Sequence, residues 1–443
     1  MKSQTRASLT FKCYAGKFLQ WIFQIASTAT SNVIAYPGAS SAQKMRINCI
    51  TTQQQLQSEI ISSNFLKKAL SYYKTFFMLY NRRLWLQQGL TALAGLAIST
   101  NVEGLPILPF SPSPGAVMLN SNENAYGPSP LAKKAILEYY LKSNRYPDDY
   151  IPLLLKKIAA HWGVADENIL LGAGSSEIIG LAALHVSEKK KKVITAEPGY
   201  KVWNGQAASF GLEFERIALT PERKNDLSAM LAAVNDETAM VYICNPNNPT
   251  GTFADVDNLK NFAIEAAKKT MVFIDEAYTE YAGLDSLASL AINNPNIIIA
   301  KTFSKIYGLA GARVGYAIAH PDIIKKLGGY QPWPNAAISV VSANAAMASL
   351  EDTGFVKDML VKTAHARGMC NETFHKLSLE YIPSSTNFIL FNINTIKKDL
   401  IKEMEAKNIY VQSRQHFNGT WCRVSMGTIE EMQLFCNALE AIV

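Results

Sequence analysis

The sequence predicts an α/β protein in which a mostly parallel central sheet is covered by helices and followed by a smaller α+β domain. Three observations predict this fold. Short runs rich in Val and Ile recur from residue 169 onward, and helix-like stretches separate most of them. After about residue 330 this alternation gives way to a different pattern. A chain of 443 residues is long enough for more than one such domain.

The strands of the central sheet are expected within residues 151–330, the predicted large domain. Each run is almost continuously apolar, which is typical of strands buried on both faces. Residues 255–269, "DVDNLKNFAIEAAKK", are typical of the helices between the strands. The predicted strands cover residues 169–172, 192–196, 240–244, 271–275, 296–300 and 313–319.

Residues 331–443 are predicted to form the smaller domain. It begins with a helix over residues 338–352. Strands follow at residues 387–393, 409–414 and 421–427, with a helix-like stretch over 396–408. Residues 105–150 precede the main sheet, and we expect them to join the smaller domain as an N-terminal arm.

Composition and charge exclude several classes of protein. The net charge of +7 comes from the start of the chain: residues 1–77 hold nine Lys and Arg against one acidic residue, while the rest holds 34 against 35. A nucleic-acid-binding protein would carry its basic residues on a folded face, so we expect no nucleic-acid partner. No apolar run reaches the roughly 18–20 residues of a membrane-spanning helix. The six cysteines lack C-x-x-C spacing, so we predict no metal site.

The N-terminal region differs from the rest of the chain. Residues 1–77 show no sustained periodicity, so we interpret them as a non-structured extension or a mis-assigned start. Residues 78–104 have the order of a secretory signal, and Arg82-Arg83 with the residues after them resembles a twin-arginine signal. This favours a periplasmic or exported enzyme translated from near Met78. A genuine long leader, or a buried helix over residues 84–98 in a cytoplasmic enzyme, stays open as an alternative.

A lysine and an arginine eight residues apart, in "TFSKIYGLAGAR", indicate a reactive amine beside a phosphate. A lysine that is partly desolvated near other cations can lose its proton and form a Schiff base with a carbonyl. The planar, charged fork of Arg313 suits phosphate. The motif "GAGSSE" predicts a glycine turn and a helix start whose free N–H groups face an anion. The residues of this predicted pocket are Ser175, Ser176, Thr302, Ser304, Lys305 and Arg313.

Three further polar residues follow predicted strands. Asp275 ends one of them, and a buried carboxylate needs a cationic partner such as a protonated pyridine nitrogen. Asn248 precedes a Pro-Thr-Gly turn, where its amide could meet a phenolic oxygen, and Tyr200 offers a flat ring for stacking. Each also has a purely structural interpretation: Asp275 as a helix cap, Asn248 as support for its own turn, and Tyr200 as a core residue.

The motifs "NPNNPTG", "DEAY" and "TFSK", with an arginine eight residues after the lysine, resemble those of fold-type I, class I/II aminotransferases that use pyridoxal 5'-phosphate (PLP). The motifs "LNSNENAYGPSP", "RYPD", "GAGSSEII" and "EPGY" are similar to those of the histidinol-phosphate aminotransferase branch. The resemblance runs from about residue 118 to the end of the chain, with the motifs in the same order and spacing. It implies PLP as cofactor, a homodimer, and small-molecule substrates: an amino donor and a 2-oxo acid acceptor.

The resemblance also implies a role for each motif residue. Lys305 would hold PLP covalently and move the proton, Asp275 would keep the pyridine nitrogen protonated, and Asn248 with Tyr278 would bind the phenolic oxygen. Tyr200 would stack on the ring. The phosphate would be held by Ser175, Ser176, Thr302, Ser304, Arg313 and, from the other subunit, Tyr146. The substrate would be bound by Asn122, Tyr126, Arg414 and Arg423.

Two departures from the branch affect the substrate and not the cofactor. Gln412 stands where the branch usually has an arginine, and Ala125 where it often has proline. Arg414 lies two residues after Gln412, so in a strand it would face the same way. The amino donor therefore stays open between histidinol phosphate and another amino acid, with a 2-oxo acid such as 2-oxoglutarate as acceptor.

Two other functions are compatible with parts of the sequence. The cofactor motifs fit a PLP-dependent lyase or decarboxylase on the same scaffold equally well. A cofactor-binding regulator would need a DNA-binding module, and residues 1–77 show no helix-turn-helix pattern.

We predict that residues 1–77 are dispensable and that the mature enzyme starts within residues 98–114, because a twin-arginine signal acts at a true N-terminus. Mass spectrometry of the native protein's N-terminus tests the start. Replacing Arg82-Arg83 with Lys-Lys should leave the enzyme in the cytoplasm. Peptides from residues 1–77 in the mature protein would contradict the first expectation, and unchanged fractionation the second.

Overall fold

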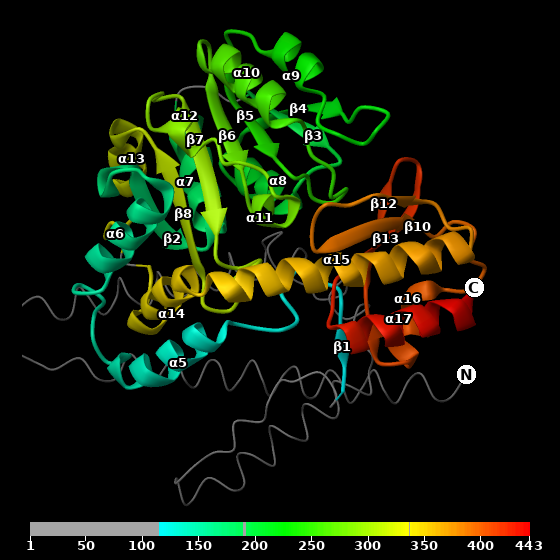
Figure 1. The fold of residues 1–443 in the computed structure, drawn as a ribbon. Helices are drawn as coiled ribbons and strands as arrows, with labels where there is room; N and C mark the ends of the chain where they lie inside the picture. The colour runs from blue at the N-terminus through cyan, green and yellow to red at the C-terminus, as the bar shows by residue number, and fades with distance from the viewer. Residues whose placement is uncertain (1–114, 189–191, 336) are drawn as a thin grey trace, which may run out of the picture. The chain divides into compact units, whose positions relative to one another are not determined.

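The structure, a computed structural model, describes residues 115–188, 192–335 and 337–443. The predicted extension over residues 1–77 and the twin-arginine-like segment over 78–104 lie outside the described residues. The element labels follow Figure 1, in which β1 and α5 are the first labelled strand and helix.

A seven-stranded sheet forms the centre of the large domain (Figure 1). Its strand order is β2-β8-β7-β6-β5-β3-β4. The pairs from β4 through β7 are parallel, and β8 runs antiparallel to both its neighbours, which confirms the predicted mostly parallel sheet. The strands are β2 (Ile169–Ala173), β3 (Lys192–Glu197), β4 (Glu213–Ala218), β5 (Thr238–Cys244), β6 (Met271–Asp275), β7 (Ile297–Thr302) and β8 (Val314–Ala319).

All six predicted strands of this sheet are present, and β4 is a seventh that the sequence analysis missed. β4 lies at the edge of the sheet, and its residues are exposed or only half-buried. Its sequence, "EFERIA", therefore lacks the continuous apolar run that identified the buried strands.

Helices cover this sheet, and the predicted helix over 255–269 is one of them, α10 (Val256–Ala267). It starts after Asp255, whose side chain accepts a hydrogen bond of 3.1 Å from the backbone N–H of Asn258 and so caps the first turn. The other helices of this domain are α6 (Ile151–Trp162), α7 (Ser175–Ser187), α8 (Lys201–Ser209), α9 (Leu227–Ala233), α11 (Thr279–Ala282), α12 (Ala288–Ala291) and α13 (Pro321–Gly328), with a 3-10 turn at Asp166–Asn168. Another 3-10 turn, at Tyr140–Lys142, precedes this domain.

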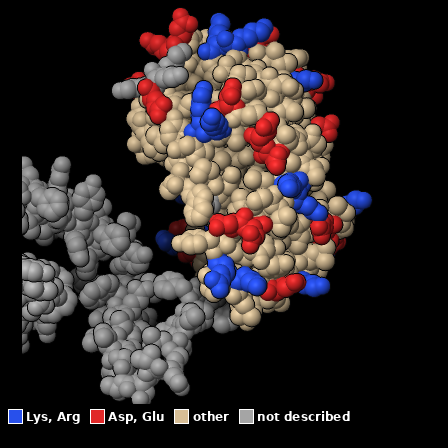
Figure 2. Space-filling model, turned by 90° about the vertical axis from the view of Figure 1, so that its left-hand side faces the viewer, with Lys and Arg blue, Asp and Glu red and all other residues tan. Residues whose placement is uncertain are grey.

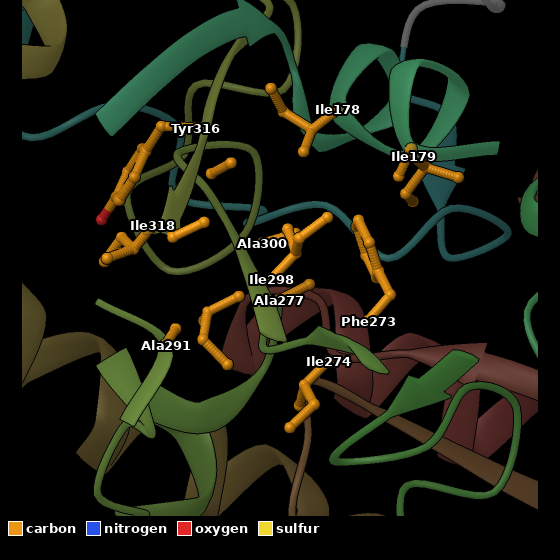
Figure 3. Close-up of a cluster of buried hydrophobic side chains, with 14 of the residues drawn as sticks. Ile178, Ile179, Phe273, Ile274, Ala277, Ala291, Ile298, Ala300, Tyr316 and Ile318 are labelled. Atoms are coloured by element: carbon orange, nitrogen blue, oxygen red, sulfur yellow. The ribbon is translucent and has the colours of Figure 1, made fainter. Parts of the chain in front are cut away.

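The central strands are buried along their whole length. Every residue of β5, β6 and β7 is buried. Figure 3 shows part of this core, including Ile178 of α7, Phe273 and Ile274 of β6 and Ile298 of β7. Burying one such side chain contributes roughly 1.5–3 kcal/mol. The core therefore fixes the strand ends, where the polar residues of the predicted pocket begin.

A second core lies in the C-terminal part of the chain, around a four-stranded antiparallel sheet of order β12-β13-β10-β9. These strands are β9 (Tyr381–Ile382), β10 (Phe388–Asn392), β12 (Gln412–His416) and β13 (Gly419–Ser425). Helices α16 (Leu400–Ala406) and α17 (Ile429–Ile442) belong to this core. The expected single strand over 409–414 is two strands, because β11 (Ile409–Tyr410) pairs with β1 while Gln412 pairs with Arg423.

Two helices join the two cores. The helix expected over 338–352 is α14 (Val340–Glu351), and α15 (Thr353–Lys376) runs on from it toward the smaller sheet (Figure 1). The sequence analysis did not identify α15. Its buried residues recur at helical spacing, but several are Thr, Ala or Cys, so the apolar stripe is weak.

The segment before α6 contacts both cores. Strand β1 (Val117–Met118) pairs in parallel with β11, and Val117 and Leu119 are buried in the second core. Helix α5 (Pro130–Tyr139) is capped by Ser129, which accepts a hydrogen bond of 3.1 Å from Ala132, and packs against α14.

The described residues show neither a surface of one charge on the face in view nor a membrane-spanning helix. On the face shown in Figure 2, basic and acidic side chains are interspersed and separated by uncharged areas. Within the described ranges, no helix combines the length and apolar character needed to span a bilayer. The same residues contain no group of three or more His, Cys, Asp and Glu side chains that could hold a metal ion.

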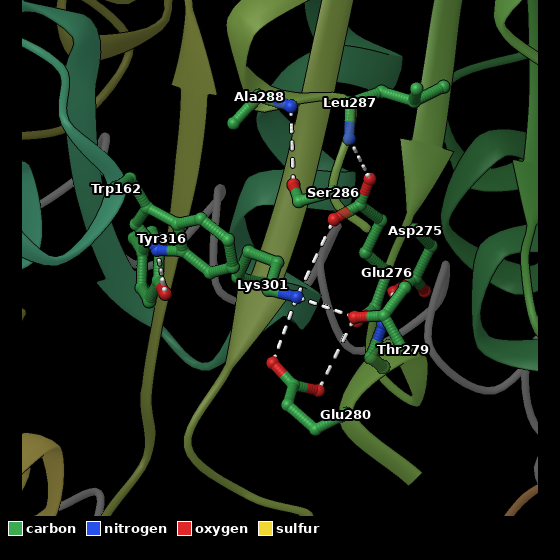
Figure 4. Close-up of polar contacts among 11 residues, drawn as sticks. Trp162, Asp275, Glu276, Thr279, Glu280, Ser286, Leu287, Ala288, Lys301 and Tyr316 are labelled. Carbon is green, nitrogen blue, oxygen red and sulfur yellow. Dashed lines mark hydrogen bonds and ion pairs between the residues drawn. The ribbon is translucent and has the colours of Figure 1, made fainter. Parts of the chain in front are cut away.

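A buried ion cluster joins the ends of β6 and β7 (Figure 4). The ammonium of Lys301 lies 2.9 Å from Glu280 and 3.5 Å from Glu276, and donates a hydrogen bond of 2.6 Å to Thr279. It also lies 4.7 Å from the ring centroid of Trp162. Burial tends to lower the pKa of Lys301, but Glu280 and Glu276 raise it overall, so the two carboxylates keep Lys301 in its charged form.

We predict that Lys301→Met lowers the free energy of unfolding by about 3–5 kcal/mol, because it leaves the buried carboxylate of Glu276 and the half-buried carboxylate of Glu280 without their cation. Chemical denaturation measures this change. The control is Lys268→Met, which removes an exposed i,i+3 ion pair with Glu265 and should change stability by less than about 0.5 kcal/mol. Equal effects of the two substitutions would show that the cluster does not stabilise the strand ends.

Candidate active site

The polar residues that follow the central strands line one cavity of about 300 Å³. The cavity lies at the carboxyl ends of the parallel strands, where open α/β sheets bind their ligands. Its wall contains every predicted cofactor residue except Tyr146, and also Asn122 from the predicted substrate set. The predicted residues in the wall are Asn122, Ser175, Ser176, Tyr200, Asn248, Asp275, Tyr278, Thr302, Ser304, Lys305 and Arg313.

Lys305 reaches the cavity from the loop after β7. Its ammonium donates a hydrogen bond of 2.9 Å to the carbonyl of Asn122 and lies 5.4 Å from the ring centroid of Tyr278. Burial and, second, the nearby Arg423 lower the pKa of Lys305 to about 8, although Asp275 opposes the shift. A substantial fraction of the amine is therefore neutral, and able to attack a carbonyl, at mildly alkaline pH.

The loop that carries Lys305 needs a glycine. Gly308 has a φ of +68°, and a Cβ there would lie 2.1 Å from the carbonyl oxygen of Gly127. The loop is thus packed closely against the segment that follows Asn122, which holds the lysine in position.

Asp275 is buried at the end of β6 without a cationic partner. Its Oδ2 accepts a hydrogen bond of 2.9 Å from the hydroxyl of Tyr242, and Oδ1 one of 3.2 Å from the N–H of Ala277. Among the residues that the structure describes, none forms an ion pair with it. Burial raises the pKa of Asp275 to about 6, despite these two hydrogen bonds. A cation brought into the cavity by a ligand would stabilise the ionised form.

Helix α7 and Arg313 together form an anion-binding end of the cavity. No side chain caps the first turn of α7, which begins at Ser175, so its N–H groups are available to an anion. Arg313 donates to the carbonyls of Ala173 (3.1 Å) and Ala310 (3.0 Å), which fixes its guanidinium beside that turn. Gly174 allows this approach, because a Cβ there would lie 2.2 Å from Arg313 Nη2. Thr302, Ser304 and Ser176 add hydroxyls within the same wall.

Tyr278 and Asn248 lie where the cavity wall meets the smaller sheet. The Tyr278 hydroxyl accepts from Nδ2 of Asn122 (3.0 Å) and of Asn248 (3.4 Å). Arg423 of β13 donates to Asn248 Oδ1 at 2.9 Å. Ser425 donates to Asn122 Oδ1 at 3.2 Å, so the smaller sheet also supports the residue that holds Lys305.

The predicted substrate residues are only partly brought together. Arg414 and Arg423 line a second, adjacent cavity of about 190 Å³, which also contains Gln412. Tyr126 lines neither cavity: its hydroxyl accepts from the N–H of Ile429 at 3.3 Å. Tyr146 is 77% exposed, with its ring 5.8 Å from that of Trp333, so a single chain does not bring it to its own cavity.

Several residues of the site were not identified from the sequence. Tyr242 and Cys244 lie on β5 beside Asp275, and their position depends on strand register. Lys201 and His416 line the second cavity. Side chains two residues apart on a strand point to the same face, so the position of His416 on β12 relative to Arg414 could have predicted that both line this cavity.

The fold and the cavity define a class of enzyme. A reactive lysine, a buried carboxylate and an anion-binding helix start at the carboxyl ends of a mostly parallel sheet are the arrangement of fold-type I PLP enzymes. The family model for aminotransferase class I and II matches residues 114–439, and the chain belongs to this family.

Known relatives narrow the similarity to one branch. The histidinol-phosphate aminotransferase of Halalkalibacterium halodurans is 32% identical over 320 residues, 71% of this chain and 86% of the relative. The structure of a putative histidinol-phosphate aminotransferase from Erwinia carotovora atroseptica has a TM-score of 0.70 and 32% identity, and covers 74% of this chain and 95% of that one. The Sinorhizobium meliloti enzyme in complex with PLP has a TM-score of 0.69 and 29% identity, over 74% and 90% of the two chains. The predicted resemblance to this branch is confirmed.

We predict that the rate at which Lys305 of the apoenzyme attaches PLP rises with pH around a midpoint near pH 8, because only the neutral amine reacts. Borohydride trapping followed by mass spectrometry measures the rate. Arg423→Met removes a cation that lowers the pKa of Lys305, so the midpoint should move to higher pH. Arg216→Met, on the exposed strand β4, is the control and should leave it unchanged. A wild-type midpoint near the ordinary lysine value of 10.5 would contradict this reading of the cavity.

Proposed function

We propose that this chain is a PLP-dependent aminotransferase that moves an amino group between a histidinol-phosphate-like amino compound, or another amino acid, and a 2-oxo acid such as 2-oxoglutarate. The observation that carries the proposal is the joint placement of Lys305 and Asp275 in one cavity beside an anion-binding helix start. The aminotransferase activity follows from the family, and the choice of substrate rests on the relatives of this branch.

The residues of the cavity fit PLP. The start of α7 and Arg313 offer donors for a phosphate, and Gly174 leaves room for Arg313 to approach. Asp275 lacks a cation that a protonated pyridine nitrogen would provide. Tyr278 and Asn248 would hold the phenolic oxygen, Tyr200 would lie against the ring, and the amine of Lys305 would bind the aldehyde carbon. When bound, PLP supplies an electron sink that makes the substrate Cα–H acidic.

The chain's own residues position the substrate and move the proton. The neutral amine of Lys305 accepts the proton that leaves the substrate Cα, and the carbonyl of Asn122 orients the resulting ammonium. Ionised Asp275, whose carboxylate accepts a hydrogen bond from Tyr242, would stabilise the positive charge of a protonated pyridine nitrogen. Arg423 offers Nε, which has no partner among the described residues, to a carboxylate or phosphate of the substrate.

A lyase or decarboxylase would use the same cofactor residues, so products decide between the activities. The loaded enzyme is incubated with L-glutamate or histidinol phosphate and an oxo acid acceptor. Appearance of the amino product and the new oxo compound in equal amounts supports transamination. Release of ammonia or carbon dioxide in their place would support the alternative.

We predict that Lys305→Ala folds normally but forms no borohydride-reducible adduct with PLP and loses transamination by at least about 10²-fold, since it removes both the attachment point and the proton carrier. Absorbance and mass spectrometry after reduction measure the adduct. Lys301→Met is no suitable control because it destabilises the sheet, whereas Lys268→Met should retain both properties. A normal adduct in Lys305→Ala would place the attachment elsewhere.

A homodimer is part of the proposal. Exposed apolar side chains on α5, the turn after it and α6 include Leu137 (72% exposed), Leu141 (72%) and Leu153 (52%), and the exposed ring of Tyr146 lies beside that of Trp333. Large exposed apolar areas mark interaction surfaces. Tyr146 lies in the segment between α5 and α6, which is consistent with its predicted contribution to the phosphate site of the other subunit.

We predict that co-expressed Lys305→Ala and Tyr146→Ala chains regain about half of the wild-type activity per mixed dimer, because one of its two sites is then intact. The activity of purified mixed dimers carrying two different tags tests this. Each variant alone is the control and should be impaired. A mixed dimer no better than Tyr146→Ala alone, or a fully active monomer in sedimentation, would contradict a shared site.

A further inference from the structure

The tip of the β12–β13 hairpin contacts a turn of the large domain. The guanidinium carbon of Arg223 lies 3.9 Å from the centroid of the Phe417 ring, within the range of a cation–π interaction. Arg223 belongs to the turn between β4 and α9, and Phe417 to the two-residue connection between β12 and β13. Both side chains are half-buried. The contact therefore joins the edge of the large sheet to the hairpin whose second strand carries Arg423.

Both residues of this contact have a backbone conformation that favours glycine. The φ angle is +63° at Arg223 and +50° at Phe417. Such left-handed values are uncommon for residues other than Gly, Asn and Asp, and they are unfavourable for bulky side chains. Asn418, the second residue of the hairpin turn, has a φ of +61° and is a type that this turn prefers. The side-chain contact between Arg223 and Phe417 offsets part of this cost.

On the hairpin side, the contact is coupled to the strand of Arg423. The Phe417 ring lies 5.4 Å from the ring of Trp421, edge-on at 77°, and Trp421 is only 2% exposed. Trp421 precedes Arg423 by two residues on β13, so the two side chains point to the same face. A displacement of the Phe417 ring would therefore reach Arg423 through one buried side chain.

On the large-domain side, the turn of Arg223 is fixed to the end of β5 and to the loop after it. Asn225 donates a hydrogen bond of 3.0 Å to the carbonyl of Cys244, the last residue of β5. The carbonyl of Arg223 accepts one of 2.5 Å from the hydroxyl of Thr252. Thr252 and Asn248 belong to the same loop. The turn that contacts the hairpin thus also holds the loop of Asn248.

These two connections converge on the pair formed by Arg423 and Asn248. Arg423 Nη1 donates to Asn248 Oδ1 at 2.9 Å, and Nη2 makes a longer contact of 3.4 Å to the carbonyl of Asn120. Arg423 moves with the hairpin and Asn248 with the loop, and Arg223 contacts both of these elements. The direction in which the Arg423 guanidinium points therefore depends on the turn of Arg223.

We propose that Arg223 is a positioning residue for substrate binding: its contact with Phe417 fixes the hairpin against the loop of Asn248 and so orients Arg423 toward the substrate. The inference rests on the proposed function, in which Arg423 binds an anionic group of the substrate. Arg223 itself lines neither the cofactor cavity nor the adjacent one, so it acts through Arg423.

The first measurement is the affinity of the PLP-loaded enzyme for glutarate, a dicarboxylate without an amino group, by calorimetry. Arg223→Gly removes the guanidinium and should weaken glutarate binding by about threefold to fivefold. The midpoint of thermal unfolding should change little, because glycine suits the left-handed backbone at this position. The matched control is Arg216→Met, which removes a cation 4.9 Å from the ring of Phe214 within β4 and should leave both quantities unchanged.

A double-mutant cycle tests whether Arg223 acts through Arg423. Arg223→Gly should weaken glutarate binding in the wild type and have no further effect in Arg423→Met. Phe417→Leu keeps an apolar side chain but removes the aromatic face, so it should reproduce the effect of Arg223→Gly. Arg223→Lys keeps a cation over the ring and should retain most of the wild-type affinity.

A second readout needs no substrate. Next to burial, Arg423 is the group that lowers the pKa of Lys305 most. An Arg423 side chain that is no longer held toward Lys305 lowers this pKa less. Arg223→Gly should therefore move the pH midpoint of PLP attachment to the apoenzyme upward, in the same direction as Arg423→Met and by a smaller amount. Arg216→Met should leave the midpoint unchanged.

The outcomes separate this inference from the proposed function. Unchanged glutarate affinity in Arg223→Gly, an equal further loss when Arg423 is already Met, or an unchanged pH midpoint would overturn the positioning role. If Arg423→Met itself leaves glutarate affinity unchanged, the substrate role that the proposed function gives to Arg423 is wrong, and the inference falls with it. A weaker affinity and a higher pH midpoint, with little change in thermal unfolding, support the inference.

Discussion

The site depends on the burial of two ionisable groups in one cavity without an ion pair between them. Asp275 is buried and Lys305 half-buried in the cavity wall, and burial raises the pKa of the first to about 6 and lowers that of the second to about 8. Both shifts disfavour the charged forms, which is unfavourable for an empty fold. A ligand that brings a cation to the carboxylate and an aldehyde to the amine removes both disadvantages. The affinity for PLP and the reactivity of the lysine therefore have the same origin, which is the burial of the strand ends.

The ends of β6 and β7 carry charged residues in two different environments. Asp275 and Thr302 face the cofactor cavity, whereas the neighbouring Glu276 and Lys301 belong to a cluster in which cation and carboxylates meet. Neighbouring residues point to opposite sides, so Glu276, whose charge Lys301 neutralises, directly follows Asp275, which has no ion-pair partner in the described part of the chain. The neutralised face fixes β6 to β7, and this fixed pair of strand ends presents the reactive groups. Positions that look alike in sequence, such as the two lysines at 301 and 305, therefore have structural and chemical roles respectively.

The cofactor cavity could be predicted from the sequence because its residues follow buried parallel strands, whose carboxyl ends meet at one edge. Continuous apolar runs identify such strands, and they failed for β4, where exposed Glu and Arg alternate with apolar residues. Helix α15 was not predicted because several of its buried residues are Ala, Thr or Cys, which weakens the apolar stripe. Tyr242 could not be assigned, since its contact with Asp275 depends on the register of β5 against β6. Tyr126 and Tyr146 came from a motif resemblance, and one chain by itself brings neither to a cavity.

The residues proposed to bind the substrate come from a different part of the fold than the residues assigned to the cofactor. Lys305, Asp275 and the anion-binding start of α7 all belong to the large domain, whereas Arg423 and Arg414 come from one hairpin of the smaller sheet. The hydrogen bond from Arg423 to Asn248 is where the two meet. A change such as arginine to Gln412 alters the charge presented to the substrate without changing any contact of Asp275 or Lys305 described for the cavity. Members of one family can therefore keep the same cofactor residues and differ in substrate. The alternation of side chains along β12 determines which of its positions can change without affecting the cofactor residues.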